Sequence, residues 1–241
     1  MKHMNDTMKS VLQVQDEIRN HTGLPVRYGP FAGMQIPLGS HFYYLLGTYE
    51  KELHAFIRAI NSLSFKRIIN VGACDGYYAV GLGLLHPESH IVALESVQGA
   101  LAGLSHLATA NDIGDRFEVG GKCTIGDLNR YVSNGDNCLV VMDCEGDEWE
   151  LLNPSSVPGL LKAHILVELH DFVRAGLSEV IRSRFCGSHT IREAKTQTRT
   201  IADLPYQPDP KNFTDELKPL YVSAINENRP CIMTFFYMEP R

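Results

Sequence analysis

The sequence predicts an α/β protein built on one doubly wound, mostly parallel sheet, with an N-terminal helical or hairpin extension. Three observations lead to this prediction. From residue 66 onward, short apolar runs alternate with segments of helical periodicity. Two of these runs, 138–143 and 164–170, are almost continuously apolar, as expected for strands that are buried on both faces of a parallel sheet. The first run leads through a turn from Gly72 to Gly76 into a helix-like segment.

The beginning of the chain has a different pattern. We expect residues 1–45 to form the extension and residues 46–241 to form the main domain. Apolar residues with helical spacing predict an amphipathic helix over 7–20. Residues 24–40 are rich in glycine and proline, which predicts a hairpin or an ordered loop. Thr48 is expected to cap a further helix that leads into the main domain.

The remaining elements follow in order along the chain. The expected strands cover residues 67–72, 90–95, 116–119, 138–143 and 164–170. The expected helices cover residues 77–85, 97–111, 125–132, 147–152 and 175–184. Residues 196–216 contain three prolines and are expected to form a long surface loop, and the apolar run 230–238 predicts a final strand.

Composition limits the classes of partner. The 241 residues are 44% hydrophobic and 21% charged, which is the composition of a globular protein with a sizeable core. A net charge of −6 gives no reason to expect a nucleic acid or an anionic membrane as partner. No apolar run approaches the roughly 20 residues that span a bilayer, and the start of the chain lacks the apolar core of a signal peptide. We therefore expect a cytoplasmic protein. A homodimer that pairs through the N-terminal helix is one option for its oligomeric state.

The six cysteines are scattered along the chain without a C-x-x-C pair. This spacing does not favour a zinc site or a disulfide framework. We expect several of them to act as small apolar side chains in or beside strands.

The turn from Gly72 to Gly76 is the most informative segment. Glycine lets the backbone approach a ligand closely, and the following helix offers free N–H groups. The next expected strand ends in Glu95, 23 residues after Gly72, where a nucleotide-binding unit places the acid that holds ribose hydroxyls. This pair predicts a cofactor that contains a nucleoside.

Every one of the first five expected strands ends in glycine or in ionisable residues. Ligands of open α/β sheets bind beyond the carboxyl ends of the strands. Each residue alone has a plain structural explanation, such as a turn or a helix cap, but together they favour a binding site. These strand ends are Gly72–Gly76, Glu95–Ser96, Gly120–Cys123, Asp143–Glu145 and Glu168–Asp171.

Glu168 interrupts an apolar strand, and it shares a strand face with His170 because residues two apart point the same way. A buried carboxylate without partners costs several kcal/mol. One explanation is a buried Glu–His pair that orients loops. The other places both residues at the substrate, with His170 as general base and Glu168 as its orienter. Asp143 at the neighbouring strand end could complete a cluster that binds a divalent cation.

Three segments resemble a known family. Residues 70–78 (Asn-Val-Gly-Ala-Cys-Asp-Gly-Tyr-Tyr) resemble the first motif of class I S-adenosylmethionine (SAM)-dependent methyltransferases. Residues 142–148 (Met-Asp-Cys-Glu-Gly-Asp-Glu) resemble the D-x-E-G-x-E segment of the FkbM-like branch, and residues 165–170 resemble the strand that follows it there. Residues 47–50 (Gly-Thr-Tyr-Glu) also fit, so the similarity spans roughly 45–172. It implies a Rossmann-like methyltransferase fold.

The resemblance also implies roles for individual residues. Gly72 to Gly76 would pass under the methionine part of SAM, Glu95 would hold the ribose, Gly121 to Cys123 would border the adenine, and Asp143 would face the methyl-transfer site. Two positions depart from the pattern: Asn70 stands where an acidic residue is common, and Cys74 where glycine or asparagine is common. Asp75 is then a candidate for contacting the ammonium of the cofactor. The expected cofactor-binding residues are Gly72, Ala73, Asp75, Gly76, Glu95, Ser96, Lys122, Cys123 and Asp143.

The expected function is therefore methyl transfer from SAM to a hydroxyl of a small molecule. Asp143, Glu168 and His170 are the expected catalytic residues, with His170 or a carboxylate as base. Three alternatives stay open: N-methylation of an amine or guanidino group, a cofactor-binding domain without catalysis, and an NAD-dependent dehydrogenase. The last would need G-x-G-x-x-G in the first turn, where only Gly72 and Gly76 are present.

Overall fold

The structure is a computed structural model that describes residues 2–22, 25–37, 40–132 and 137–241, with side chains from Ser10 onward. The chain divides into two compact units. Unit 1 comprises residues 1–54 and 197–230, and unit 2 comprises residues 55–196 and 231–241.

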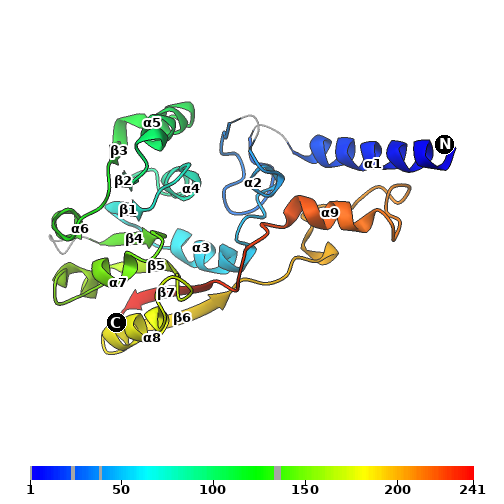
Figure 1. Cartoon of the computed structure of the whole chain (residues 1–241). Coiled ribbons are helices and arrows are strands. Elements are labelled where there is room, and N and C mark those ends of the chain that lie inside the picture. The colour runs from blue at the N-terminus through cyan, green and yellow to red at the C-terminus, as the bar shows by residue number, and fades with distance from the viewer. Residues whose placement is uncertain (1, 23–24, 38–39, 133–136) are drawn as a thin grey trace. The chain divides into compact units, whose positions relative to one another are not determined.

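Unit 2 contains a seven-stranded sheet in the order β3-β2-β1-β4-β5-β7-β6 (Figure 1). Strands β1 to β5 are parallel to one another, and β7 runs antiparallel to both β5 and β6. The strands are β1 (Arg67–Val71), β2 (His90–Leu94), β3 (Phe117–Gly120), β4 (Cys138–Met142), β5 (His164–Leu169), β6 (His189–Lys195) and β7 (Thr234–Pro240). The carboxyl ends of the five parallel strands therefore lie at one edge.

Helices cover both faces of this sheet. Figure 1 shows α3, α4 and α5 on one face and α6, α7 and α8 on the other. These helices are α3 (His54–Asn61), α4 (Tyr77–Leu85), α5 (Leu101–Ala110), α6 (Ile125–Val132), α7 (Glu148–Leu151) and α8 (Leu177–Phe185). Every residue of β4 is buried, because this strand lies in the middle of the sheet with helices on both sides. The prediction of a doubly wound, mostly parallel sheet is confirmed.

The sequence pattern located the central elements closely but missed an edge strand. The expected bounds of α4 and α6 agree with the structure. Strand β6 was not expected, and it lies between the expected helix 175–184 and the expected loop 196–216. It carries Arg192, Glu193 and Lys195 and lies at the edge of the sheet that the described residues form, beside β7, so it lacks the continuous apolar run of the central strands. An edge strand that faces solvent is polar for this reason.

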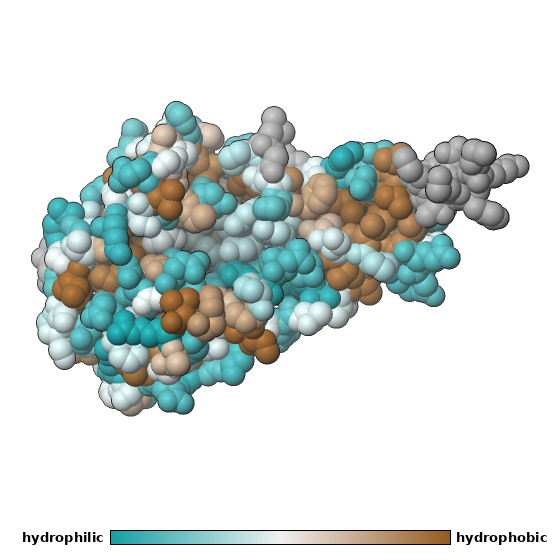
Figure 2. Space-filling model, viewed as in Figure 1, coloured by the Kyte–Doolittle hydropathy of each residue, from teal (hydrophilic) through white to brown (hydrophobic). Residues whose placement is uncertain are grey.

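Unit 1 is built around two helices, α1 (Lys2–His21) and α9 (Lys218–Ile225), with the short helix α2 (Phe42–Leu46). Buried apolar residues of α1, α2 and α9, among them Ile18, Leu46 and Tyr221, form one cluster. Hydrophobic residues are also visible on the surface over α1 and α9 in Figure 2, and Leu12 of α1 is 52% exposed. The expected N-terminal helix is confirmed and is longer than the predicted range 7–20.

Residues 25–37 form a loop held by two backbone hydrogen bonds between Val26 and the segment Gly33–Met34. It contains no strand, so the ordered loop rather than the hairpin of strands is found there. Leu24 and residues 38–39 of the expected 24–40 segment lie outside the described residues.

Residues 197–230, which we expected within the main domain, pack with the N-terminal segment in unit 1. A buried ionic group joins the two: the Arg199 guanidinium lies 2.6 Å from a Glu52 oxygen and 2.5 Å from a Glu227 oxygen. The loop expected over 196–216 contains a short 3-10 helix, Ile201–Asp203, and α9 follows it. Among the described residues, no helix has the length and apolar character needed to cross a membrane.

Candidate active site

The turn after β1 is a sharp corner that only glycine allows. Gly72 has φ +77°, and a Cβ added there would lie 1.6 Å from the backbone oxygen of Asp143. The backbones of the β1 and β4 ends meet at this point, where the Asp143 N–H donates to the Val71 carbonyl at 2.9 Å. Gly76 also has a positive φ, and a Cβ there would press on Leu104 at 3.0 Å. Both glycines of the motif are therefore required by the fold itself.

Glu95 ties the end of β2 to this corner. Its side chain accepts a hydrogen bond from the Cys74 N–H at 2.8 Å through Oε2 and from the Val97 N–H at 2.7 Å through Oε1. Cys74 itself has φ +47°, an uncommon backbone conformation for a residue with a side chain. Since an ionised carboxylate has about four acceptor positions, Oε2 retains capacity for a further donor. Glu95 is both a fixed part of the corner and an acceptor at its surface.

A cleft of about 290 Å³ opens beside the corner. This volume is close to the lower end of the range for small-molecule sites, about 300–1,000 Å³. It brings together residues from four of the five expected strand ends. Six of the expected cofactor-binding residues line it: Gly72, Glu95, Ser96, Lys122, Cys123 and Asp143.

Lys122 and Cys123 border the cleft after β3. The Lys122 ammonium lies 2.7 Å from a carboxylate oxygen of Asp147, another lining residue. Cys123 is buried, and burial together with the nearby Asp127 carboxylate raises the pKa of its thiol to about 12. Cys123 is therefore a neutral, apolar wall at neutral pH.

The other three expected cofactor-binding residues lie in the corner without lining the described cleft. Ala73 and Gly76 are buried. Asp75 is exposed, and its Oδ1 accepts a hydrogen bond from the Tyr77 N–H at 3.2 Å, at the start of α4. The structure thus gives Asp75 a helix-capping contact, while its contact to a cofactor ammonium stays a prediction.

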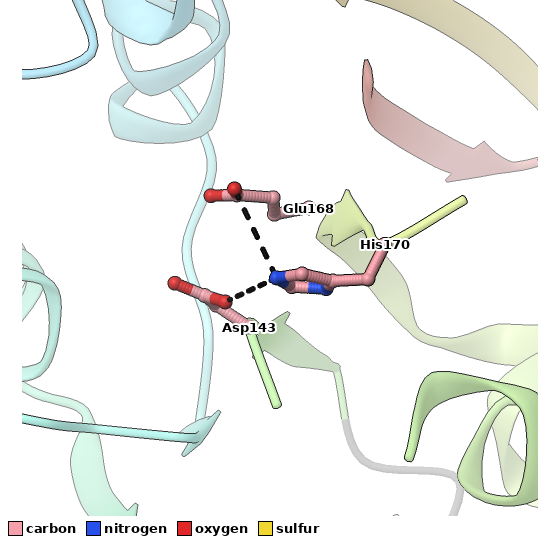
Figure 3. Close-up of side chains that lie close together, drawn as sticks. All are labelled: Asp143, Glu168 and His170. Atoms are coloured by element: carbon pink, nitrogen blue, oxygen red, sulfur yellow. Dashed lines mark ion pairs between the residues drawn. The ribbon is translucent and has the colours of Figure 1, made fainter. Parts of the chain in front are cut away.

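The three expected catalytic side chains meet at the ends of β4 and β5. His170 Nε2 lies 3.4 Å from Asp143 Oδ1 and 3.9 Å from Glu168 Oε1, and Figure 3 shows both carboxylates directed to this nitrogen. The side chains of Glu168 and His170 are 3% and 2% exposed, whereas that of Asp143 is 42% exposed. Asp143 therefore connects the buried cluster with the cleft.

Two further carboxylates of this cluster were not among the expected catalytic or cofactor-binding residues, although the expected strand end Asp143–Glu145 included one of them. The Glu145 Oε2 lies 3.5 Å from His170 Nε2, on a side chain that is 78% exposed. The Glu148 Oε1 lies 2.9 Å from His170 Nδ1, on a side chain with no exposed surface. Both belong to the segment 142–148 that the motif had already marked, so the motif spacing was the signal that could have identified them.

The carboxylates control the protonation of His170. Burial acts to lower the pKa of His170, but Glu148, Asp143 and Glu145 outweigh it, and the pKa is raised. Burial acts to raise the pKa of Glu148, but the hydrogen bonds from His170 and from the Cys144 N–H outweigh it, and the pKa is lowered. Glu148 is therefore ionised at neutral pH beside an imidazole that binds its proton more tightly than usual.

This cluster can accept a proton or hold a cation. Asp143, Glu168 and His170 each offer a ligand atom, and these atoms lie within 4.8 Å of one another. Oxygen and imidazole ligands suit divalent cations such as Mn²⁺. The same imidazole nitrogen, when bare, can serve as a general base.

Solved structures share this fold. One is the O-methyltransferase TomG from Streptomyces achromogenes, involved in tomaymycin synthesis and solved with SAM; it is 12% identical, with 78% of each chain covered and a TM-score of 0.51. Another is an O-methyltransferase from Bacillus cereus in complex with SAH; it is 13% identical, with 97% of this chain and 91% of that chain covered and a TM-score of 0.51. No family model and no curated protein matches the sequence. These structural similarities establish the Rossmann-like methyltransferase fold.

Proposed function

We propose that this protein is a SAM-dependent methyltransferase, of class I and the FkbM-like branch, that methylates a hydroxyl group of a small molecule. One observation carries the proposal. Asp143 lines the cleft beside the glycine corner and also lies 3.4 Å from His170 Nε2 in the buried cluster. A candidate cofactor site and a candidate proton-accepting site therefore share one residue.

The cleft fits the nucleoside part of SAM. Gly72 lines the cleft, and its lack of a side chain lets the ends of β1 and β4 meet there. Glu95 Oε2 has acceptor capacity left for a ribose hydroxyl. Lys122 and Cys123 would border the adenine, and Ser96 would lie next to the ribose.

SAM, when bound, supplies a methyl group that is attached to a positively charged sulfur, and this sulfur leaves as a neutral thioether. The protein orients the acceptor and removes its proton. His170 Nε2 takes the proton of the acceptor hydroxyl, and the electron pair of the broken O–H bond forms the new bond to carbon. Asp143 and Glu168 stabilise the resulting imidazolium from 3.4 and 3.9 Å.

An apolar surface lies next to the cluster. Phe172 and Val173 follow β5 and are 56% and 54% exposed. The Phe172 ring is in contact with the His170 ring, with centroids 5.6 Å apart. Because adjacent large apolar side chains in water are unfavourable, this pair supports an organic acceptor that packs on it.

The test is direct binding followed by turnover. Isothermal titration with SAM, its demethylated product and NAD should show binding of the first two and not of NAD. Turnover of radiolabelled SAM with a panel of phenols and polyols should then label an acceptor, and His170→Gln should abolish the label. Binding of NAD alone would overturn the assignment, and SAM binding without labelling of any acceptor would favour a domain without catalysis.

As an alternative to His170 as the base, we propose a divalent cation held by Asp143, Glu168 and His170. The fit rests on their ligand atoms, which lie within 4.8 Å of one another and include one imidazole nitrogen. A cation bound there would lower the pKa of the acceptor hydroxyl. Titration of the protein with Mn²⁺ should show one site that Asp143→Asn weakens at least tenfold. No binding at millimolar Mn²⁺, with activity insensitive to EDTA, would leave His170 as the base and refute the cation.

N-methylation is a second candidate because the cluster has an excess of acidic groups. Four carboxylates, from Asp143, Glu145, Glu148 and Glu168, lie within 3.9 Å of a single imidazole. Such a site favours a cationic acceptor such as an amine. In the same labelling assay, transfer to amines with no transfer to hydroxyl compounds would select this candidate over the first.

A further inference from the structure

Glu148 is the least accessible carboxylate of the cluster, and the proposed reaction does not use it directly. Its side chain has no exposed surface, and it belongs to α7, directly after the turn that carries Asp143. Its Oε1 lies 2.9 Å from His170 Nδ1 and 2.9 Å from the Cys144 backbone nitrogen. It therefore joins the β4 turn to the end of β5.

The burial of Glu148 is costly. Among the described residues its second oxygen, Oε2, is buried without a hydrogen-bond partner. A buried carboxylate costs several kcal/mol unless its partners compensate it, and an apolar side chain of similar size would avoid that cost. The position is explained if the charge has a task that an apolar side chain cannot perform.

The chemistry of the contact defines the task. The Cys144 N–H can only donate, so Glu148 Oε1 is an acceptor there. An ionised carboxylate is an acceptor toward its second partner as well, which requires a proton on His170 Nδ1. In the neutral form of His170 with this proton, the bare nitrogen is Nε2, the one that Asp143 and Glu168 approach.

We propose that Glu148 is a positioning residue that keeps the proton of neutral His170 on Nδ1, so that Nε2 is the bare nitrogen at the cluster. Without it, the proton distribution should reverse. Asp143, Glu145 and Glu168 all approach Nε2, and three carboxylates attract a proton to that nitrogen. Glu148 is the acceptor at Nδ1 that opposes them. This inference rests on the proposed function for its catalytic consequence, but the proton position is a property of the folded protein alone.

The first test uses the wild-type protein without substrate. Proton–nitrogen correlation spectra of the ¹⁵N-labelled imidazole at one alkaline pH distinguish a bare nitrogen from a protonated one. The signals of His170 are identified by their absence from the spectrum of His170→Gln. They should show a bare Nε2 and a protonated Nδ1. A bare Nδ1 in the wild-type protein would overturn the proposal.

The second test removes the charge with little change of shape. Glu148→Gln should move the proton of neutral His170 to Nε2, because an uncharged amide at Nδ1 no longer opposes the three carboxylates that attract a proton to Nε2. The matched control is Glu150→Gln on the same helix, where the side chain is 61% exposed and pairs with Arg174; its spectrum should equal that of the wild type. An unchanged His170 spectrum in Glu148→Gln would contradict the proposal.

Kinetics add an independent readout. For metal-binding histidines, removing the partner that orients the ring typically costs about 10–100-fold in metal affinity or activity, and we take this range as a guide. We expect Glu148→Gln to lower kcat by that factor with little change in the KM of the acceptor, and Glu150→Gln to change neither. If the wild type transfers no methyl group but its spectra show a bare Nε2, the proposed function is refuted and the role of Glu148 stands. If the wild type turns over but its spectra show a protonated Nε2, the role of Glu148 is refuted and the proposed function stands.

Discussion

The corner at Gly72 provides the most demanding test of the site, because its geometry predicts a large effect from one added methyl group. In Gly72→Ala the new Cβ would lie 1.6 Å from the Asp143 carbonyl oxygen, whereas real Cβ atoms essentially never come closer than 3.0 Å. The ends of β1 and β4 must therefore separate by more than an ångström. Asp143, which connects the cleft with His170, would move with them.

The magnitude follows from three contributions. An alanine held at φ +77° costs about 1–2 kcal/mol relative to glycine. Separation of the strands stretches the hydrogen bond from the Asp143 N–H to Val71, which is worth about 1 kcal/mol. Repacking a crowded interior adds about 1–3 kcal/mol. The expected loss in the free energy of unfolding is thus about 3–6 kcal/mol.

The assay is urea unfolding followed by titration with SAM. With a slope of about 3 kcal/mol per molar urea, the midpoint should fall by about 1–2 M. Any folded Gly72→Ala should also bind SAM at least tenfold more weakly. The control is Gly103→Ala in α5, where an added Cβ meets nothing within 4 Å; it should raise stability by up to about 1 kcal/mol. A Gly72→Ala midpoint within about 0.3 M of the wild type, with unchanged SAM affinity, would refute the reasoning.

Three further predictions concern single side chains. Glu95→Gln should weaken SAM binding about tenfold in isothermal titration, because a neutral amide accepts a hydrogen bond from a ribose hydroxyl less strongly than a carboxylate does. The control is Glu88→Gln at an exposed position, which should bind SAM like the wild type. Burial acts to lower the pKa of His170, but the Glu148 carboxylate outweighs burial, so this pKa lies above about 6.5. Because the base must be unprotonated, kcat/KM should rise as the pH increases through the pKa of His170. A pH profile of kcat/KM that is flat from about pH 6 to 9 would contradict this prediction. The protonated His170 favours the folded state below this pKa, and that contribution is lost as pH rises through it. Arg116→Met should destabilise unit 2 by about 2 kcal/mol in thermal unfolding, because its guanidinium donates to the carbonyls of Gly83, His86 and Ser89.

The central sheet and the site residues were accessible from the sequence for a common reason. Buried parallel strands such as 138–142 show continuous apolar runs, and their carboxyl ends share one edge. The sequence alone therefore predicts that Asp143, Glu168 and His170 lie close together. Strand β6 and helix α9 were missed because polar residues at an edge and a short helix after a proline-rich loop carry weak local signals.

By itself, the sequence determined the alternation of strands and helices, the glycine corner and the set of ionisable strand ends, because each depends on residues that are close in the chain. Only the tertiary structure decided that Glu148 meets His170 across 22 residues and that Asp143 belongs to both the cleft and the buried cluster. These contacts depend on the register of β4 against β5 and on the way α7 returns to the sheet. Local periodicity does not encode such distances, because they are fixed only when the strands pair and the helices pack on them.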